Sequence, residues 1–333
     1  MSDVKFNKVA IVGAGAIGGW IGVHLAREGA QISVLARGDT LAALQTHGLQ
    51  LHQGGALHTT PVTASNDAAQ LGVQDLVVIS VKAPALATVA AQVGPLIGPG
   101  TMVLTAMNGV PWWFLQGFGG PVQNQALATT DPDGAIARAI PAAHIVGCVV
   151  HASCSVDAPG VIRHHFGDGL IVGEPSGQAT ARVQALHALL QSAGFNATLS
   201  PQIQKDIWFK LWGNMTVNPI SALTGATSDR LLDDDLVRGF MSSVMLEAKA
   251  IGERIGIPIA QAPEDRHAVT RKLGAFRTSM LQDVQAGKPV ELDALVSAVR
   301  ELGQLTGVAT PFTDALLGLS RLHAGVLGLY PAP

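Results

Sequence analysis

Three polar side chains, Lys210, Asn214 and Asn218, are spaced four residues apart within a largely apolar segment. At about 100° per residue, this spacing places them on one face of a helix. Burying an ammonium and two carboxamides is costly unless each finds a polar partner, so this face either binds a polar ligand or is exposed to solvent. A lysine ammonium beside a ligand could donate a proton and stabilise negative charge that develops on an oxygen atom.

The amino-terminal segment carries a glycine pattern that is typical of dinucleotide binding. The pattern follows an apolar run, opens a helical segment and consists of Gly13, Ala14, Gly15, Ala16, Ile17 and Gly18. The first glycine allows a tight turn, the second keeps the backbone clear for a pyrophosphate, and the third lets the helix pack on the strand. Glycine-rich turns also occur without ligands, but the position of this one in an alternating strand and helix pattern favours a dinucleotide site.

The residues after the predicted strands indicate which dinucleotide binds. The second strand runs into Arg37, where an NAD site usually has an acidic residue that grips the ribose hydroxyls. A guanidinium suits a 2′-phosphate, because its fork can bind two oxygens, so we expect NADP(H). Asp39 lies nearby and keeps NAD(H) as the alternative. Lys82 and Asn108 follow later strands directly, at the edge where ligands of such sheets bind.

Other clusters of reactive side chains indicate no metal site. The acidic run 233–235 is typical of a solvated helix start, and adjacent histidines such as His164 and His165 point to opposite faces of a strand. Two cysteines, Cys148 and Cys154, are too few for a disulfide framework or a four-ligand zinc site. We interpret them as core thiols of a protein in a reducing cytoplasm.

The first part of the chain alternates short apolar runs with helical patterns. The runs cover residues 9–12, 32–35, 76–81, 102–107 and 145–150, which predicts βαβ units around a parallel sheet covered on both faces. Residues 160–173 read as an antiparallel hairpin that reverses at Gly167, Asp168 and Gly169. A helix is predicted over residues 180–192.

From Gln202 onward the apolar period is helical almost to the end, with breaks near Pro219 and in the segments 256–263, 287–289 and 307–311. The punctuation by serine and proline near residue 200 favours a boundary there. We therefore expect two domains, 1–200 for cofactor binding and 201–333 for the substrate and catalysis.

Length and composition narrow the class of protein. A chain of 333 residues is long for one hydrophobic core, and a net charge of −3 without a dense basic run argues against nucleic acid as a partner. Proline and glycine interrupt the long uncharged stretch 83–130, so no apolar run of about 20 residues predicts a membrane span. The abundance of apolar residues permits a homodimer.

Taken in order, these motifs resemble those of the ketopantoate reductase family, also called 2-dehydropantoate 2-reductases, over nearly the whole chain. The resemblance rests on the glycine motif, Val81-Lys82, Asn108-Gly109, Trp208-Phe209-Lys210 with Asn214 and Asn218-Pro219, and Ser279-Met280-Leu281-Gln282-Asp283 followed by Glu291-Leu292-Asp293.

The resemblance implies an α/β fold, with an N-terminal Rossmann-like dinucleotide-binding domain followed by an all-α helical C-terminal domain. It implies NADPH-dependent reduction of 2-dehydropantoate to (R)-pantoate in pantothenate biosynthesis, with Lys210 as the catalytic lysine and Glu291 as its partner carboxylate. The cofactor residues it implies are the glycine motif, Arg37, Lys82, Asn108, Ser153 and Glu291. The substrate residues it implies are Asn108, Lys210, Asn214, Asn218, Ser228 and Ser279.

Three departures from the family pattern bear on the substrate. Ser228 stands where the family has a substrate-binding asparagine, Phe276 occupies a commonly polar position, and Ser153 replaces a small apolar residue near the cofactor. The aromatic segment 112–114 either packs in a core or lines the active cleft, and core packing is favoured. The alternatives are therefore a reductase of another branched or aromatic 2-oxo acid and, from a different class, a noncatalytic NADP(H)-sensing protein.

Overall fold

The computed structural model describes residues 4–331, which form two compact units. The first unit comprises the residues up to Met107 together with Gly134–Asp206. The second comprises Asn108–Asp133 and the residues from Ile207 onward. Residues 108–133 thus group with the helical unit, whereas the division expected from sequence places them with the first.

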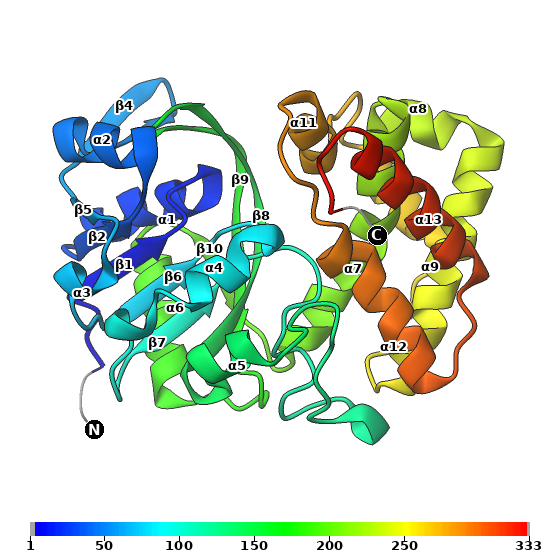
Figure 1. Cartoon of the computed structure of the whole chain (residues 1–333), viewed down its shortest axis with the longest axis horizontal. Coiled ribbons are helices and arrows are strands. Elements are labelled where there is room, and N and C mark those ends of the chain that lie inside the picture. The colour runs from blue at the N-terminus through cyan, green and yellow to red at the C-terminus, as the bar shows by residue number, and fades with distance from the viewer. Residues whose placement is uncertain (1–3, 332–333) are drawn as a thin grey trace. The chain divides into compact units, whose positions relative to one another are not determined.

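The first unit is built around one mixed sheet (Figure 1) in the strand order β4-β3-β9-β8-β7-β6-β1-β2-β5, with β10 paired to β9. The strands are β1 (Lys8–Val12), β2 (Gln31–Leu35), β3 (Leu49–Gln53), β4 (Ala56–Thr60), β5 (Thr63–Ser65), β6 (Leu76–Ile79), β7 (Met102–Thr105), β8 (Ile145–Ala158), β9 (Val161–Gly173) and β10 (Asn196–Leu199). Every residue of β6 and β7 is buried, as expected for parallel strands covered on both faces. The predicted α/β class is confirmed.

Register aligns the carboxyl ends of the central strands. Val12 pairs with Leu35 of β2 and with Ile79 of β6, and Ile79 pairs in turn with Thr105 of β7. The loops that leave β1, β2 and β6 therefore start at one edge of the sheet, which is where ligands of open α/β sheets bind.

The predicted reversal at Gly167-Asp168-Gly169 is wrong. Strands β8 and β9 form one long antiparallel pair, and the chain turns at Pro159 and Gly160 instead. Gly167 lies inside β9 with φ of +79°, opposite a shift of register between His151 and Ser153. A glycine with positive φ inside a strand makes a bulge and bends it, whereas Pro-Gly supplies a true reversal.

Short helices connect these strands. They are α1 (Ala16–Arg27), α2 (Gly38–His47), α3 (Ala68–Leu71), α4 (Leu86–Ala90), α5 (Ala135–Ala139) and α6 (Ala181–Ser192), with 3₁₀ turns at Ala83–Ala85, Gly94–Leu96 and Ala142–His144. Helix α6 confirms the helix predicted over residues 180–192, and Thr180 caps it by accepting a hydrogen bond from the Val183 N–H.

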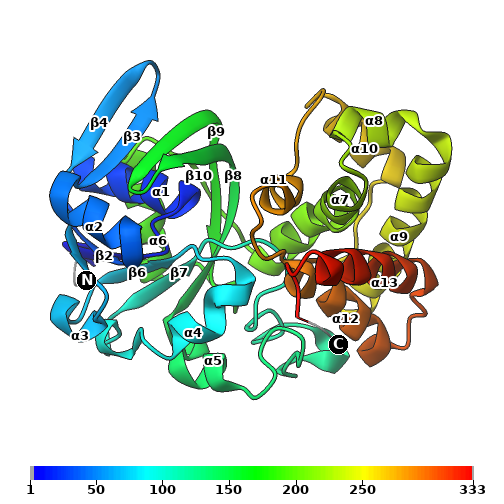
Figure 2. The same ribbon diagram turned by 45° about the horizontal axis from the view of Figure 1, so that its top comes forward.

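The second unit is helical, and Figure 2 shows α7 surrounded by the other helices of this unit. The helices are α7 (Ile203–Thr224), which starts at the end of the first unit, α8 (Ser228–Asp233), α9 (Asp235–Arg254), α10 (Pro263–Arg271), α11 (Ser279–Gln285), a π turn η5 (Asp293–Ser297), α12 (Ala298–Thr306) and α13 (Pro311–Val326), with a 3₁₀ turn at Gly120–Val122. Trp208, Trp212 and Met215 of α7 are at most 1% exposed.

The predicted break at Pro219 is wrong, because α7 continues through it to Thr224. Proline removes one backbone hydrogen bond from a helix interior, at a cost of about 3 kcal/mol. The neighbours Asn218 and Ile220 are 7% and 4% exposed, so packing on both sides of the proline keeps this stretch helical.

Residues 108–133 are held in the second unit by aromatic packing and a carboxylate. Trp112, Trp113 and Phe114 are at most 4% exposed, and the Phe114 ring centroid lies 6.0 Å from that of Trp208. Glu301 of α12 accepts hydrogen bonds from the N–H groups of Ala128 (2.7 Å) and Thr129 (2.9 Å). The aromatic segment therefore packs in a core.

Within residues 4–331, none of the helices has the length and apolar character needed to cross a membrane.

Candidate active site

The glycines of the loop between β1 and α1 have two different roles. A Cβ on Gly13 would lie 2.7 Å from Val81 Cγ1, and one on Gly18 would lie 2.3 Å from the Gly13 carbonyl oxygen. A Cβ on Gly15, in contrast, would meet no protein atom within 4 Å. Gly13 and Gly18 are thus required by the packing of the loop, while Gly15 leaves the backbone open on the outside. This is the cradle that a pyrophosphate needs, and the residues present fit a dinucleotide.

Ser80 supports the same loop, and the motif analysis missed it. Its hydroxyl donates to the Gly13 carbonyl at 2.8 Å, and its Oγ would lie 2.1 Å from a Cβ on Gly18. The signal available in the sequence is a small hydroxyl residue at the end of the strand that pairs with β1.

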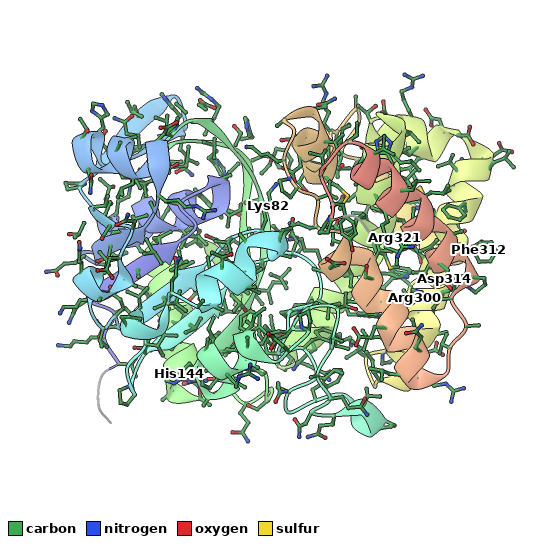
Figure 3. The ribbon with its side chains drawn as sticks, viewed as in Figure 1. Lys82, His144, Arg300, Phe312, Asp314 and Arg321 are labelled. Carbon is green, nitrogen blue, oxygen red and sulfur yellow. The ribbon has the colours of Figure 1, made fainter. Side chains whose placement is uncertain are left out.

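Three further predicted cofactor residues belong to the first unit, two of them just after strands and one within a strand. Arg37 is exposed two residues after β2, and Lys82, labelled in Figure 3, is exposed three residues after β6. Both follow strands paired directly with β1, so they stand at the edge that carries the glycine loop. Ser153 is half-buried and pairs with Phe166 on the part of β8 that continues beyond its pairing with β7.

The second unit brings Lys210 and Asn108 together. Lys210 Nζ donates a hydrogen bond to Asn108 Oδ1 at 2.9 Å, although the two residues are 102 positions apart. Both residues are half-buried, and the ammonium is held by a specific acceptor. A positioned ammonium of this kind can act as a proton donor.

The remaining polar groups of the α7 face lie along the same helix. Asn214 is half-buried and Asn218 is 7% exposed, so this face is not a solvated surface. Glu291 is 6% exposed and lies two residues before the start of η5 at Asp293. Ser279 is exposed at the first position of α11.

Ser228 has a different environment from the other predicted substrate residues. It is 1% exposed, and its hydroxyl donates to the Gly274 carbonyl at 2.9 Å. Its backbone N–H donates to the Phe276 carbonyl at 3.0 Å. The Ser228 hydroxyl proton is thus used to hold the segment 274–276, and only its lone pairs are available to a ligand.

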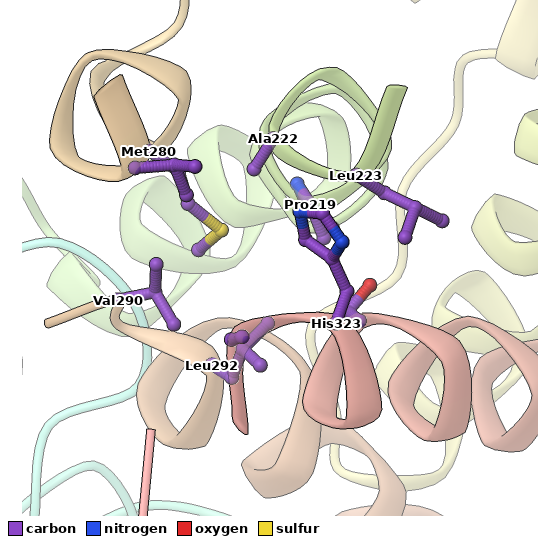
Figure 4. Close-up of a pocket in the computed structure, with 10 residues that line it drawn as sticks. Pro219, Ala222, Leu223, Met280, Val290, Leu292 and His323 are labelled. Carbon is purple, nitrogen blue, oxygen red and sulfur yellow. The ribbon is translucent and has the colours of Figure 1, made fainter. Parts of the chain in front are cut away.

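A small apolar pocket lies in the second unit (Figure 4). It is lined by Pro219, Ala222, Leu223, Met280, Val284, Val290, Leu292, Ser320, His323 and Ala324. Several of these residues are chain neighbours of predicted site residues, since Pro219 follows Asn218 and Met280 follows Ser279. The volume is about 10 Å³, room for about one water molecule, so the pocket as it stands admits no aromatic ring.

The acidic run and the cysteines have structural environments. Asp234 caps α9 by accepting from the Val237 N–H at 2.9 Å. Burial raises the pKa of the Cys154 thiol to about 12, which makes it a poor nucleophile. In the part of the chain that the structure describes, no three His, Cys, Asp or Glu side chains are grouped to hold a metal ion.

Two sequence profiles match the chain. The family described as "Ketopantoate reductase PanE/ApbA" matches residues 9–112, and "Ketopantoate reductase PanE/ApbA C terminal" matches residues 202–324. Together the two matches span more than half of the chain, and they cover the glycine loop and helix α7.

Relatives with known names agree with the profiles. The 2-dehydropantoate 2-reductase of Mesorhizobium japonicum is 44% identical over 324 residues, which cover 97% of this chain and 99% of that protein. A solved structure from Ralstonia solanacearum MolK2, which carries a provisional ketopantoate reductase name, is 59% identical with a TM-score of 0.95 and covers 98% of this chain and 100% of that one.

A solved structure with lower sequence identity has a similar fold. D-mandelate dehydrogenase with NADH and anilino(oxo)acetate has a TM-score of 0.83 at 20% identity, covers 97% of this chain and 99% of that one, and resembles this chain in fold alone. The profile matches and the close relative, together with a glycine cradle and a paired lysine at the predicted positions, lead to one conclusion. This chain belongs to the ketopantoate reductase family.

Proposed function

We propose that the protein reduces 2-dehydropantoate to (R)-pantoate with NADPH, as a step of pantothenate biosynthesis in the cytoplasm. The observation that carries this proposal is the hydrogen bond from Lys210 to Asn108, which holds an ammonium on the α7 face beside two carboxamides. Family membership supports the reaction. Arg37, exposed beyond β2, supports the 2′-phosphorylated cofactor, and the free thiols of Cys148 and Cys154 suit a reducing compartment.

The cofactor residues we assign are the glycine loop from Gly13 to Gly18, Arg37, Lys82, Asn108, Ser153 and Glu291. Gly15 leaves room for the pyrophosphate, and the first turn of α1 directs backbone N–H groups toward it. The Arg37 guanidinium would hold the 2′-phosphate. NADPH, when bound, supplies the hydride that converts the keto carbon to an alcohol carbon.

The chain's own part in the reaction centres on Lys210. As negative charge grows on the keto oxygen, the ammonium stabilises it and transfers a proton from Nζ to that oxygen. Asn108 Oδ1 holds the ammonium in place before the transfer, and solvent restores the proton afterwards. Glu291 is the partner carboxylate that keeps the lysine protonated. Asn214, Asn218, Ser279 and Ser228 orient the substrate, with Ser228 contributing lone pairs only.

The test is to follow NADPH absorbance while the purified protein meets 2-dehydropantoate and then a set of bulkier 2-oxo acids. We expect the highest kcat/KM with 2-dehydropantoate, and tighter binding of NADPH than of NADH in paired Kd measurements. A higher kcat/KM for a branched or aromatic 2-oxo acid would keep the mechanism and change the substrate. The replacement of the family's asparagine by Ser228 is the observation that favours this alternative.

A noncatalytic NADP(H) sensor is the alternative from another class. Such a protein would bind NADPH but would oxidise it with none of the 2-oxo acids tested. A sensor would have no need of the Lys210 ammonium held by Asn108, because Lys210 is not among the assigned cofactor residues.

A further inference from the structure

The segment that carries Glu291 enters its helix through a π turn. Residues Asp293–Ser297 form η5, and regular α-helix resumes only at Ala298. A π turn is rare, and where it occurs it often lies at a functional site. It also interrupts the regular ladder of helical hydrogen bonds, so a main-chain carbonyl can accept a bond from outside the helix. Contacts from elsewhere must hold this conformation in place.

One of these contacts joins η5 to the loop of Asn108. The Ala294 carbonyl accepts a hydrogen bond from the Val110 N–H at 2.8 Å. Gly109 has φ of +81°, and a Cβ there would lie 2.5 Å from the same carbonyl oxygen. The loop therefore lies directly against the π turn, and only glycine permits this approach. Asn108, the next residue back along the chain, accepts the bond from Lys210.

The second contact comes from the carboxyl-terminal end of the chain. The Tyr330 hydroxyl donates to Asp293 Oδ1 at 2.5 Å, and the same oxygen accepts from Ser297 at 3.2 Å. The Leu329 carbonyl accepts a hydrogen bond from the Val290 N–H at 3.1 Å. Residues 329 and 330 therefore contact the chain on both sides of Glu291. Burial and the neighbouring Asp293 raise the pKa of Tyr330 to about 12, which keeps its hydroxyl a donor at neutral pH.

Tyr330 is the single tyrosine of the sequence. The ring alone could be supplied by phenylalanine, so the feature that needs explaining is the hydroxyl on a carboxylate. The described contacts form a continuous path from Tyr330 through Asp293, Ala294 and Val110 to Asn108, and from there to Lys210.

We propose that Tyr330 is a positioning residue for the proton donor: its bond to Asp293 holds η5 against the loop 108–110 and so sets the place of Asn108 and Lys210. The inference rests on the proposed function for its kinetic test. It adds to that function a residue that acts on the lysine through η5 and the loop 108–110.

The first experiment compares Tyr330→Phe with the wild-type protein. Because small displacements of catalytic groups are costly, we expect kcat with 2-dehydropantoate to fall on the order of 10-fold, with the Kd of NADPH changed by less than about twofold. Ser243→Ala, which removes an exposed hydroxyl bonded to Gly239 outside this path, is the matched control and should retain wild-type kcat. An unchanged kcat in Tyr330→Phe would overturn the proposal.

Two further variants separate positioning from general loss of structure. Asp293→Asn keeps an oxygen that accepts the Tyr330 hydroxyl and should retain most of kcat, whereas Asp293→Ala should match Tyr330→Phe. In an Asn108→Ala background, Tyr330→Phe should lower kcat little further, because both changes act on the same lysine. An additive loss in the double variant would contradict the path through Asn108.

A readout without turnover keeps this inference distinct from the proposed function. In protein whose lysines carry ¹³C-methyl labels, the Lys210 signal, identified by its loss in Lys210→Arg, should move in Tyr330→Phe and stay in Ser243→Ala. Absence of turnover in the wild-type protein would defeat the proposed function alone. A Lys210 signal with the same chemical shift in Tyr330→Phe as in the wild-type protein would contradict the positioning role alone.

Discussion

At the scale of single residues, the chemistry depends on where one ammonium is held. Lys210 lies on helix α7, whose opposite side carries the buried side chains of Trp208, Trp212 and Met215. Because these side chains are closely packed, the backbone of the helix has little freedom to move. Its Nζ is bound to Asn108, and the residue as a whole is half-buried. A rigid backbone and a specific acceptor for the ammonium hold a proton donor in a defined position.

Replacing the lysine should remove proton donation and leave cofactor binding intact. We expect Lys210→Ala to lower kcat by roughly 10²- to 10⁴-fold, with the Kd of NADPH nearly unchanged. Lys205→Ala is the control, since Lys205 is an exposed lysine on the same helix. Turnover in Lys210→Ala close to that of the wild type would refute the assignment of Lys210.

Arg37 should decide the choice between the two nicotinamide cofactors. A charge-assisted pair with a phosphate contributes about 1.5–3 kcal/mol, so Arg37→Gln should raise the Kd of NADPH about 10- to 100-fold. NADH lacks the 2′-phosphate, and its Kd should change little. Titrations of both cofactors, with exposed Arg27→Gln as the control, check this difference. Equal losses for NADPH and NADH would show that Arg37 does not contact the 2′-phosphate.

At the scale of elements, the turn from β1 to α1 combines a structural and a binding role in one short loop. Gly18→Ala would force a Cβ to 2.3 Å from the Gly13 carbonyl oxygen. Overpacking of this kind typically costs 1–3 kcal/mol, so we expect a clear fall in the free energy of unfolding. Gly15→Ala meets no protein atom and should leave stability nearly unchanged while weakening NADPH binding.

Thermal unfolding and cofactor titration of both variants separate these roles. Gly239→Ala provides the control, because Gly239 lies in α9 with no atom within 4 Å of its added Cβ, and alanine there favours the helix. NADPH binding by Gly15→Ala as tight as that of the wild type would show that the pyrophosphate lies elsewhere.

At the scale of the whole molecule, each unit contains a buried histidine that resists protonation. Burial lowers the pKa of His24, whose Nδ1–H donates to the Ala193 carbonyl at 2.7 Å. Burial also lowers the pKa of His267, which contacts Ser242 Oγ at 2.9 Å through Nε2. Both rings are accommodated in the neutral form.

Stability should therefore fall in mild acid. The unfolded histidines titrate near 6.5, above their folded-state values, so the unfolded chain binds more protons as the pH decreases. The contribution is fully present above pH 6.5 and is lost as the pH falls toward the lowered values. Urea midpoints at pH 7.5 and pH 5 measure the loss, which should be smaller in His24→Gln and unchanged in exposed His47→Gln. A midpoint independent of pH would contradict this account.

The homodimer that the composition permits stays a prediction. Leu319, Leu322 and Val326 of α13 are 57%, 67% and 79% exposed at helical spacing. An apolar stripe of this kind is compatible with self-association without demonstrating it.

Local patterns in the sequence were enough to determine the strand-to-helix glycine loop, the strand ends at Arg37 and Lys82, and the shared helical face of Lys210, Asn214 and Asn218. These features depend on backbone sterics and on periodicities of two or 3.6 residues, which neighbouring residues set among themselves. The family resemblance added Glu291 and the substrate, which no local pattern could supply.

Only the tertiary structure decided where distant segments meet. Whether Pro219 ends a helix or Gly167 reverses a strand depends on the packing around each, because burial outweighs the local preference. The bond between Lys210 and Asn108, the support of the glycine loop by Ser80 and the path from Tyr330 through η5 each join residues far apart in the chain. Such contacts depend on the packing of a whole unit. The sequence therefore identifies the residues involved but does not show which of them contact each other.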